Sequence, residues 1–256
     1  MNDSPGTDLR GARFEDVEMN GAILHGVDLS DAQFRSVDLS RVVMRGVDLI
    51  DVDISGEVEN LVINGVDVAP LIEAELDRRH PDRVKMRPVD ADGFRDAWAI
   101  LDRLWAGTID RARRFTPDQL DESVNGEWSF IETLRHLTFA TDSWIRRAIL
   151  GDPSPWDQLG LPFAEWPDGP EFTRDLNARP SLDEVLELRR DRTATVRDYL
   201  ADLTSASLNG ETTPVDAPGW PPSKSYSVRQ CLRIVLNEEW QHRLYVERDF
   251  DVLDHQ

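Results

Sequence analysis

A five-residue period near the N-terminus constrains the fold of this chain more than any other feature of its sequence. A large apolar residue stands at every fifth position, and a small or β-branched residue precedes most of these by two positions. Because helices repeat every 3.6 residues and strands every two, neither element accounts for this period. A chain with two inward positions in five can wind as a square solenoid, each repeat forming one face. The large residues are Leu9, Phe14, Met19, Leu24, Leu29, Phe34, Leu39, Met44, Leu49 and Ile54.

This segment resembles the pentapeptide-repeat family, whose pattern is a small residue, Asp or Asn, Leu or Phe, and two polar residues. Asp28-Leu29 and Asp38-Leu39 match that pattern closely. The resemblance implies a short right-handed quadrilateral β-helix within residues 1–66. Acidic solenoids of the family can mimic DNA and bind gyrase, but two to three coils at about 5 Å each span only ~12 Å. We therefore expect a docking or structural role.

Composition excludes several functional classes. The net charge of −20 opposes a phosphate backbone, so we expect no direct binding to nucleic acid. Cys231 is the only cysteine, which rules out an intrachain disulfide and favours a reducing compartment. Neither a signal peptide nor an apolar run of about 18 residues is present, and this predicts a cytoplasmic protein without membrane contact.

The rest of the chain has helical periodicity. Residues 67–90 predict a linker with a short helix that begins near Pro70, ends before Pro81 and caps the solenoid. Over 91–256, apolar stripes predict four helices, from 91 to about 114, 128 to about 150, 181 to about 203, and 227 onward. Ser181 and Ser227 are the expected N-caps of the last two helices. The chain is thus predicted to be a mixed multidomain protein, a β-helix followed by an all-α four-helix bundle.

Two long connections interrupt the predicted bundle. Residues 151–180 and 213–225 are rich in Pro, Gly and Trp, and Trp220 lies in the second of them. Loops of this length are usually functional or disordered, and their aromatic residues favour packing. We expect the segment from Pro153 to Pro170 either to close over a cavity or to be a purely structural excursion.

Three residues of the predicted bundle have the types and spacing of a metal site. Glu238 and His242 are four residues apart, which places both side chains on one helix face, and His136 belongs to another helix. Imidazole and carboxylate suit Zn²⁺, Ni²⁺ or Fe²⁺, and three protein ligands leave a position open for water or a thiolate. A histidine on a helix is also often structural, so spacing alone leaves both interpretations open.

Two segments of the bundle resemble the DinB superfamily. Residues 127–137, with a Trp-Ser pair at Trp128, then Glu132 and a helical His136, are similar to a signature of that family. Residues 237–245 lie where the family usually has a His-x-x-x-His pair. The resemblance covers about residues 91–253. It implies a four-helix bundle that binds a divalent metal.

The resemblance implies His136, Glu238 and His242 as the ligands, with Zn²⁺ the first choice and Ni²⁺ or Fe²⁺ the alternatives. Glu238 stands where the family more often has histidine, which leaves the identity of the metal open. Glu132 is a candidate general base or a helix-stabilising carboxylate. Arg248 is a candidate substrate contact or a surface partner of Asp249.

The superfamily includes S-transferases that use mycothiol or bacillithiol, thiol-dependent isomerases and metal-dependent hydrolases. A metal lowers the pKa of a bound thiol or water, so that its anion exists near neutral pH. We expect transfer of such a low-molecular-weight thiol to an electrophilic small molecule. A metal-dependent hydrolase is the first alternative. A non-catalytic scaffold that docks through the solenoid is the second, and a homodimer is compatible with all three.

Overall fold

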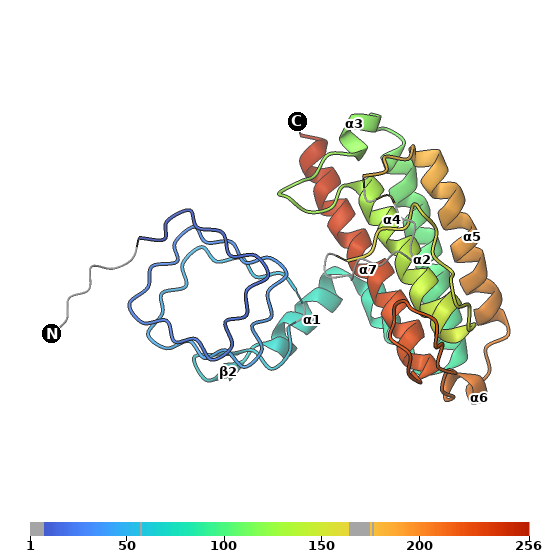
Figure 1. Ribbon diagram of the computed structural model, residues 1–256, viewed down its shortest axis with the longest axis horizontal. Helices are drawn as coiled ribbons and strands as arrows, with labels where there is room; N and C mark the ends of the chain where they lie inside the picture. The colour runs from blue at the N-terminus through green and yellow to red at the C-terminus, as the bar shows by residue number, and fades with distance from the viewer. Residues whose placement is uncertain (1–7, 57, 164–174, 176, 256) are drawn as a thin grey trace. The chain divides into compact units, whose positions relative to one another are not determined.

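The computed structural model describes residues 8–56, 58–163, 175 and 177–255 (Figure 1). The chain divides into two compact units, Met1–Glu57 and Val58–Gln256. The first unit contains the five-residue repeats, and the second contains all the helices of the described residues. No helix in these residues is long and apolar enough to cross a membrane.

The first unit changes direction at every fifth residue. The backbone angle φ lies between 50° and 74° at residues 11, 16, 21, 26, 31, 36, 41, 46 and 51. At alternate corners a hydrogen bond closes the turn, as where the Ala12 amide donates to the Leu9 carbonyl at 2.9 Å. Gly11 adopts the left-handed conformation of this turn without a steric penalty. The five-residue period is therefore the spacing of the corners in the coils seen in Figure 1.

The structure bears out the expected β-helix only in part. Within residues 8–56 it contains no β-strand. The large apolar residues at every fifth position stay about half exposed, from 49% at Leu39 to 63% at Ile54. A β-helix needs strands that pair from coil to coil and a buried interior, and this unit has neither over the described residues. The repeat pattern is correct, whereas the closed, packed β-helix stays a prediction.

The second unit begins with a small hairpin and a short helix. Strands β1 (Val62–Ile63) and β2 (Val66–Asp67) pair antiparallel through an Asn-Gly turn, the sequence that favours tight hairpins. Helix α1 (Ala69–Arg79) follows with proline in its first turn and ends before Pro81, as predicted. The 3₁₀-helix η1 (Pro81–Met86) then leads towards the bundle.

Four long helical segments form the bundle. They are α2 (Ala91–Ala112), α4 (Phe130–Thr141) with the π-helix η2 (Asp142–Ile149) that continues it, α5 (Leu182–Ala201), and α7 (Val228–Leu253). Short helices α3 (Pro117–Leu120) and α6 (Ser205–Leu208) lie in the connections. α4 packs against both α5 and α7, and α2 packs against the same two helices. The predicted helical C-terminal region is confirmed.

The sequence signals at the helix starts have different outcomes. Ser181 and Glu184 form the predicted capping box, in which each side chain bonds the other residue's backbone amide. Ser227 is the N-cap residue of α7, as predicted, but its side chain makes no capping hydrogen bond. The backbone of α7 instead continues from an irregular segment in which the Val228 amide donates to the Gly210 carbonyl at 3.1 Å.

A buried ion pair lies within the apolar core. Both terminal nitrogens of Arg189, on α5, donate to the Glu239 carboxylate, on α7, at 2.8 Å. The side chains of this pair are 7% and 2% exposed, and the Arg189 guanidinium lies 5.6 Å from the ring centre of Trp105. The pair therefore connects α5 to α7 inside the bundle. The apolar core of the bundle includes the large residues Phe94, Leu101, Leu134, Leu137, Leu236 and Phe250.

We expect the second unit to fold without the first. A fragment of residues 58–256 retains the whole apolar core and should keep the helical far-UV circular dichroism of the full chain. A shorter fragment that begins at Val89 should melt at a lower temperature, because it lacks Met86, which packs against the core, and the Pro88 carbonyl that Arg233 bonds. Collapse of fragment 58–256 would contradict this independence.

Candidate metal centre

The three predicted ligands come together between α4 and α7. His136 lies on α4, and Glu238 and His242 lie one turn apart on α7. One carboxylate oxygen of Glu238 is 3.4 Å from Nε2 of His136 and 3.1 Å from Nε2 of His242. The three ligand atoms all lie within 4.8 Å of one another. Tetrahedral zinc ligands at about 2.1 Å from the ion are roughly 3.4 Å apart, so the residues present fit a divalent metal.

The charge of Glu238 also suits a ligand. Burial by itself would raise the pKa of this carboxyl group, but its interactions with the imidazoles of His136 and His242 outweigh burial and lower the pKa to about 2. Glu238 is therefore ionised at any physiological pH. Its side chain is 30% exposed, against 9% for His136, so the site is open on the side of α7.

The second nitrogen of His136 has a specific partner. Nδ1 lies 3.0 Å from the backbone carbonyl oxygen of Leu161. A carbonyl only accepts, so Nδ1 carries the proton, and Nε2 faces the other two ligands. This arrangement of a histidine between a carbonyl and a metal is common in metalloproteins, where it fixes the orientation of the ring.

Aromatic rings surround the two histidines. The ring centre of Trp128 lies 4.4 Å from that of His136 and 5.8 Å from that of His242. Tyr245 contacts His242 edge-on at 5.9 Å, and Phe139 lies 6.3 Å from His136. These rings restrict water around the ligands and reduce the local polarity. The Trp-Ser pair thus combines two roles, because its serine caps α4 while its tryptophan covers the ligands.

The observed contacts of Glu132 and Arg248 are with residues other than the three ligands. The Glu132 carboxylate accepts the Ser129 amide at 2.9 Å and so caps α4, which is the helix-stabilising role considered for it. Arg248 donates to Asp249 at 2.8 Å and lies over the Tyr245 ring at 5.4 Å. A catalytic role for Glu132 or Arg248 stays a prediction.

The single cysteine is not part of the site. Cys231 is completely buried, and burial raises the pKa of its thiol to about 12. It is therefore a neutral core residue rather than a nucleophile. Any thiol that reacts at this site has to come from another molecule.

The two long connections contact each other. Phe163 and Trp220 meet edge-on with ring centres 5.0 Å apart. A side chain on Gly219 would collide with the Trp156 ring, since an added Cβ would lie 2.0 Å from it. The remainder of the predicted closing loop, residues 164–174, lies outside the described residues. The described parts of the two connections contact each other, and closure of the first connection over a cavity stays a prediction.

Comparison with known protein families gives two matches. A family model described as the DinB superfamily matches residues 100–246. A model of pentapeptide repeats matches eight copies over residues 5–35 and 28–56. The chain matches no curated protein and no solved structure.

Proposed function

The chain belongs to the DinB superfamily, and we propose that its helical unit is a metal-dependent enzyme that transfers a low-molecular-weight thiol to an electrophilic small molecule. The observation that carries this proposal is the convergence of His136, Glu238 and His242 within 4.8 Å. Mycothiol and bacillithiol are the thiols that we expect. Two histidines and a carboxylate form a known zinc set with an open position, so Zn²⁺ is the expected ion, ahead of Ni²⁺ and Fe²⁺.

A bound divalent metal would lower the pKa of the incoming thiol and so provide a thiolate near neutral pH. The chain supplies the rest of the chemistry. Glu238 is a permanent anion at the site, and the Leu161 carbonyl holds the proton of His136 on the nitrogen remote from Glu238. Trp128 covers both histidines and restricts the water that would compete with the thiol. The thiol proton leaves to solvent and the sulfur forms the new bond to the electrophile, whose leaving group departs with the electron pair of the broken bond or, if that group stays attached, takes up a proton from solvent.

We expect conjugation of mycothiol or bacillithiol to a model electrophile to depend on added Zn²⁺ and to exceed the uncatalysed rate. Product formation followed by mass spectrometry is the measurement. Cys231→Ala should retain the activity, because the neutral, buried Cys231 thiol takes no part. Cleavage of ester or amide substrates without conjugation would replace this proposal by metal-dependent hydrolysis, and absence of both reactions would favour a non-catalytic scaffold.

For the N-terminal unit we propose a docking role. Its apolar side chains are about half exposed over residues 8–56, and such surfaces are commonly covered by a partner. The strongly acidic chain disfavours nucleic acid, so a protein, including a second copy of this chain, is the expected partner. A closed β-helix would be the form in which these side chains are buried.

A further inference from the structure

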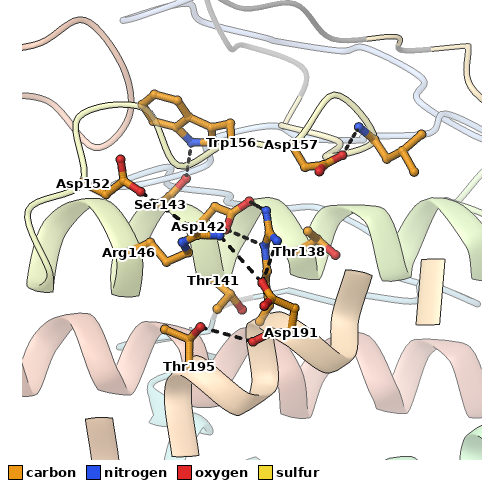
Figure 2. Close-up of polar contacts among 12 residues, drawn as sticks. Thr138, Thr141, Asp142, Ser143, Arg146, Asp152, Trp156, Asp157, Asp191 and Thr195 are labelled. Atoms are coloured by element: carbon orange, nitrogen blue, oxygen red, sulfur yellow. Dashed lines mark hydrogen bonds and ion pairs between the residues drawn. The ribbon is translucent and has the colours of Figure 1, made fainter. Parts of the chain in front are cut away.

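One stretch of the first long connection runs along α4 and η2, and we call residues 152–161 the strap. Its contacts are antiparallel to the helix, so that the start of the strap lies at the end of η2. Arg147, near the end of η2, donates to the Pro153 carbonyl at 3.1 Å. The Trp156 indole donates to the Ser143 hydroxyl at 3.3 Å, a contact visible in Figure 2.

The middle of the strap meets a buried carboxylate. The backbone amide of Asp157 donates to the carboxyl group of Asp142, which is completely buried and also accepts from Arg192 at 2.9 Å. Figure 2 shows Asp142 on the helix beneath Asp157. These contacts fix the backbone of the strap well away from the metal ligands.

The last residues of the strap reach the candidate metal centre. Arg135 donates through Nε to the Leu159 carbonyl at 2.8 Å, and its own carbonyl accepts the Leu161 amide at 3.2 Å. The carbonyl of the same residue, Leu161, accepts the hydrogen bond from Nδ1 of His136. Arg135 is 1% exposed, and its terminal nitrogens bond two more carbonyls, those of Asp175 and Ala178. One buried guanidinium therefore fixes the chain on either side of residues 164–174.

We propose that Arg135 is a positioning residue for His136, which it orients by holding the end of the strap so that the Leu161 carbonyl accepts the proton of Nδ1. Without the guanidinium, the Leu159 carbonyl loses its donor, and the bond from the Leu161 amide to the Arg135 carbonyl is left as the main contact that holds the end of the strap to α4. The imidazole then loses the acceptor that fixes its ring orientation. The effect on metal affinity rests on the proposed function, whereas the effect on the histidine proton does not.

The test compares three variants of the full chain. Arg135→Met removes the donors, and Arg135→Lys keeps one charge but cannot reach several carbonyls at once. Arg147→Met is the matched control, because Arg147 is also 1% exposed and also bonds backbone carbonyls, at the far end of the strap. Each protein is first checked for helical circular dichroism, and all measurements are made below its melting temperature.

Two readouts separate positioning from general loosening. Nitrogen-15 NMR of the metal-free protein follows solvent exchange of the Nδ1 proton of His136. Competition with a chromophoric chelator gives the dissociation constant for Zn²⁺, and Co²⁺ absorption reports the ligand geometry. In Arg135→Met we expect the Nδ1 proton of His136 to exchange faster with solvent. We also expect this variant to bind Zn²⁺ about 10–100-fold more weakly, the usual effect when a metal-binding histidine loses the hydrogen-bond partner of its other nitrogen. Arg135→Lys should lie between, and Arg147→Met should match the wild type.

The proposal would be overturned by an Arg135→Met protein that folds, exchanges the Nδ1 proton of His136 as slowly as the wild type and binds Zn²⁺ with the wild-type affinity. Equal losses in Arg147→Met would overturn it too, because they would mean that any loosening of the strap has the same effect. If Arg135→Met does not fold, Arg135→Lys decides the question by the same measurements. If the wild type binds no Zn²⁺, the proposed function fails, and the proton exchange of His136 still decides whether Arg135 orients it.

Discussion

Replacing His242 by alanine is expected to abolish stoichiometric metal binding. His242 supplies one of three ligand atoms, and its Nε2 lies 3.1 Å from the Glu238 oxygen that completes the set with His136. Two remaining protein ligands make a much weaker site than three. Elemental analysis after incubation with Zn²⁺ and gel filtration should find about one ion per wild-type chain and only a trace in the variant.

The matched control is His255→Ala. His255 is exposed at the end of the chain and lies outside the metal cluster of the described residues, so its loss removes an imidazole without touching the site. This variant should keep its metal. Equal metal contents in the wild type and His242→Ala would remove the proposed centre and, with it, the case for a metal-dependent enzyme.

Glu239→Ala should be the most destabilising of the changes considered, although its neighbour Glu238 is the one that belongs to the candidate metal centre. The substitution leaves Arg189 buried without its carboxylate, and breaking a buried pair from one side typically costs about 3–5 kcal/mol. For a unit of this size, that loss lowers the melting temperature by about 6–20 °C. Urea unfolding followed by circular dichroism measures the change in unfolding free energy.

Two further variants distinguish the roles of the adjacent glutamates. Glu238→Gln should lose the metal but change the unfolding free energy of the metal-free protein by only about 1 kcal/mol, because this side chain is partly exposed. Replacing both members of the core pair, as in Arg189→Leu with Glu239→Leu, should recover much of the stability, since neither charge is then left alone. A Glu239→Ala protein as stable as the wild type would show that the pair contributes nothing.

The geometry of the candidate metal centre was predictable because it depends on local rules. Glu238 and His242 share a helix face by their spacing, and the Trp-Ser signature positions His136 at a defined distance from the start of α4. Glu239 points away from the ligands for the same reason, since adjacent residues differ by about 100° around a helix. Its partner Arg189 lies 50 residues away, and no local pattern identifies it.

What the sequence could not predict depends on contacts made by backbone groups. The Leu161 carbonyl beside His136 and the carbonyls around Arg135 belong to irregular chain, and every residue type presents the same carbonyl. Arg135 stands three residues after Glu132, the spacing of an ordinary ion pair on a helix surface, so its place in the sequence gives no signal of these contacts. In the first unit, the five-residue period indicates corners and inward positions, but it does not determine whether neighbouring coils pair.

The two faces of α7 also have a consequence for how the sequence of such a protein can evolve. Glu238 and Glu239 are consecutive, yet Glu238 belongs to the candidate metal centre and Glu239 bonds Arg189 on α5. A mutation at the first position can therefore exchange a carboxylate for an imidazole and shift the preference for one metal over another without disturbing the interior. The preferred metal and the stability of the fold can then vary independently, although the two residues responsible are adjacent in the sequence.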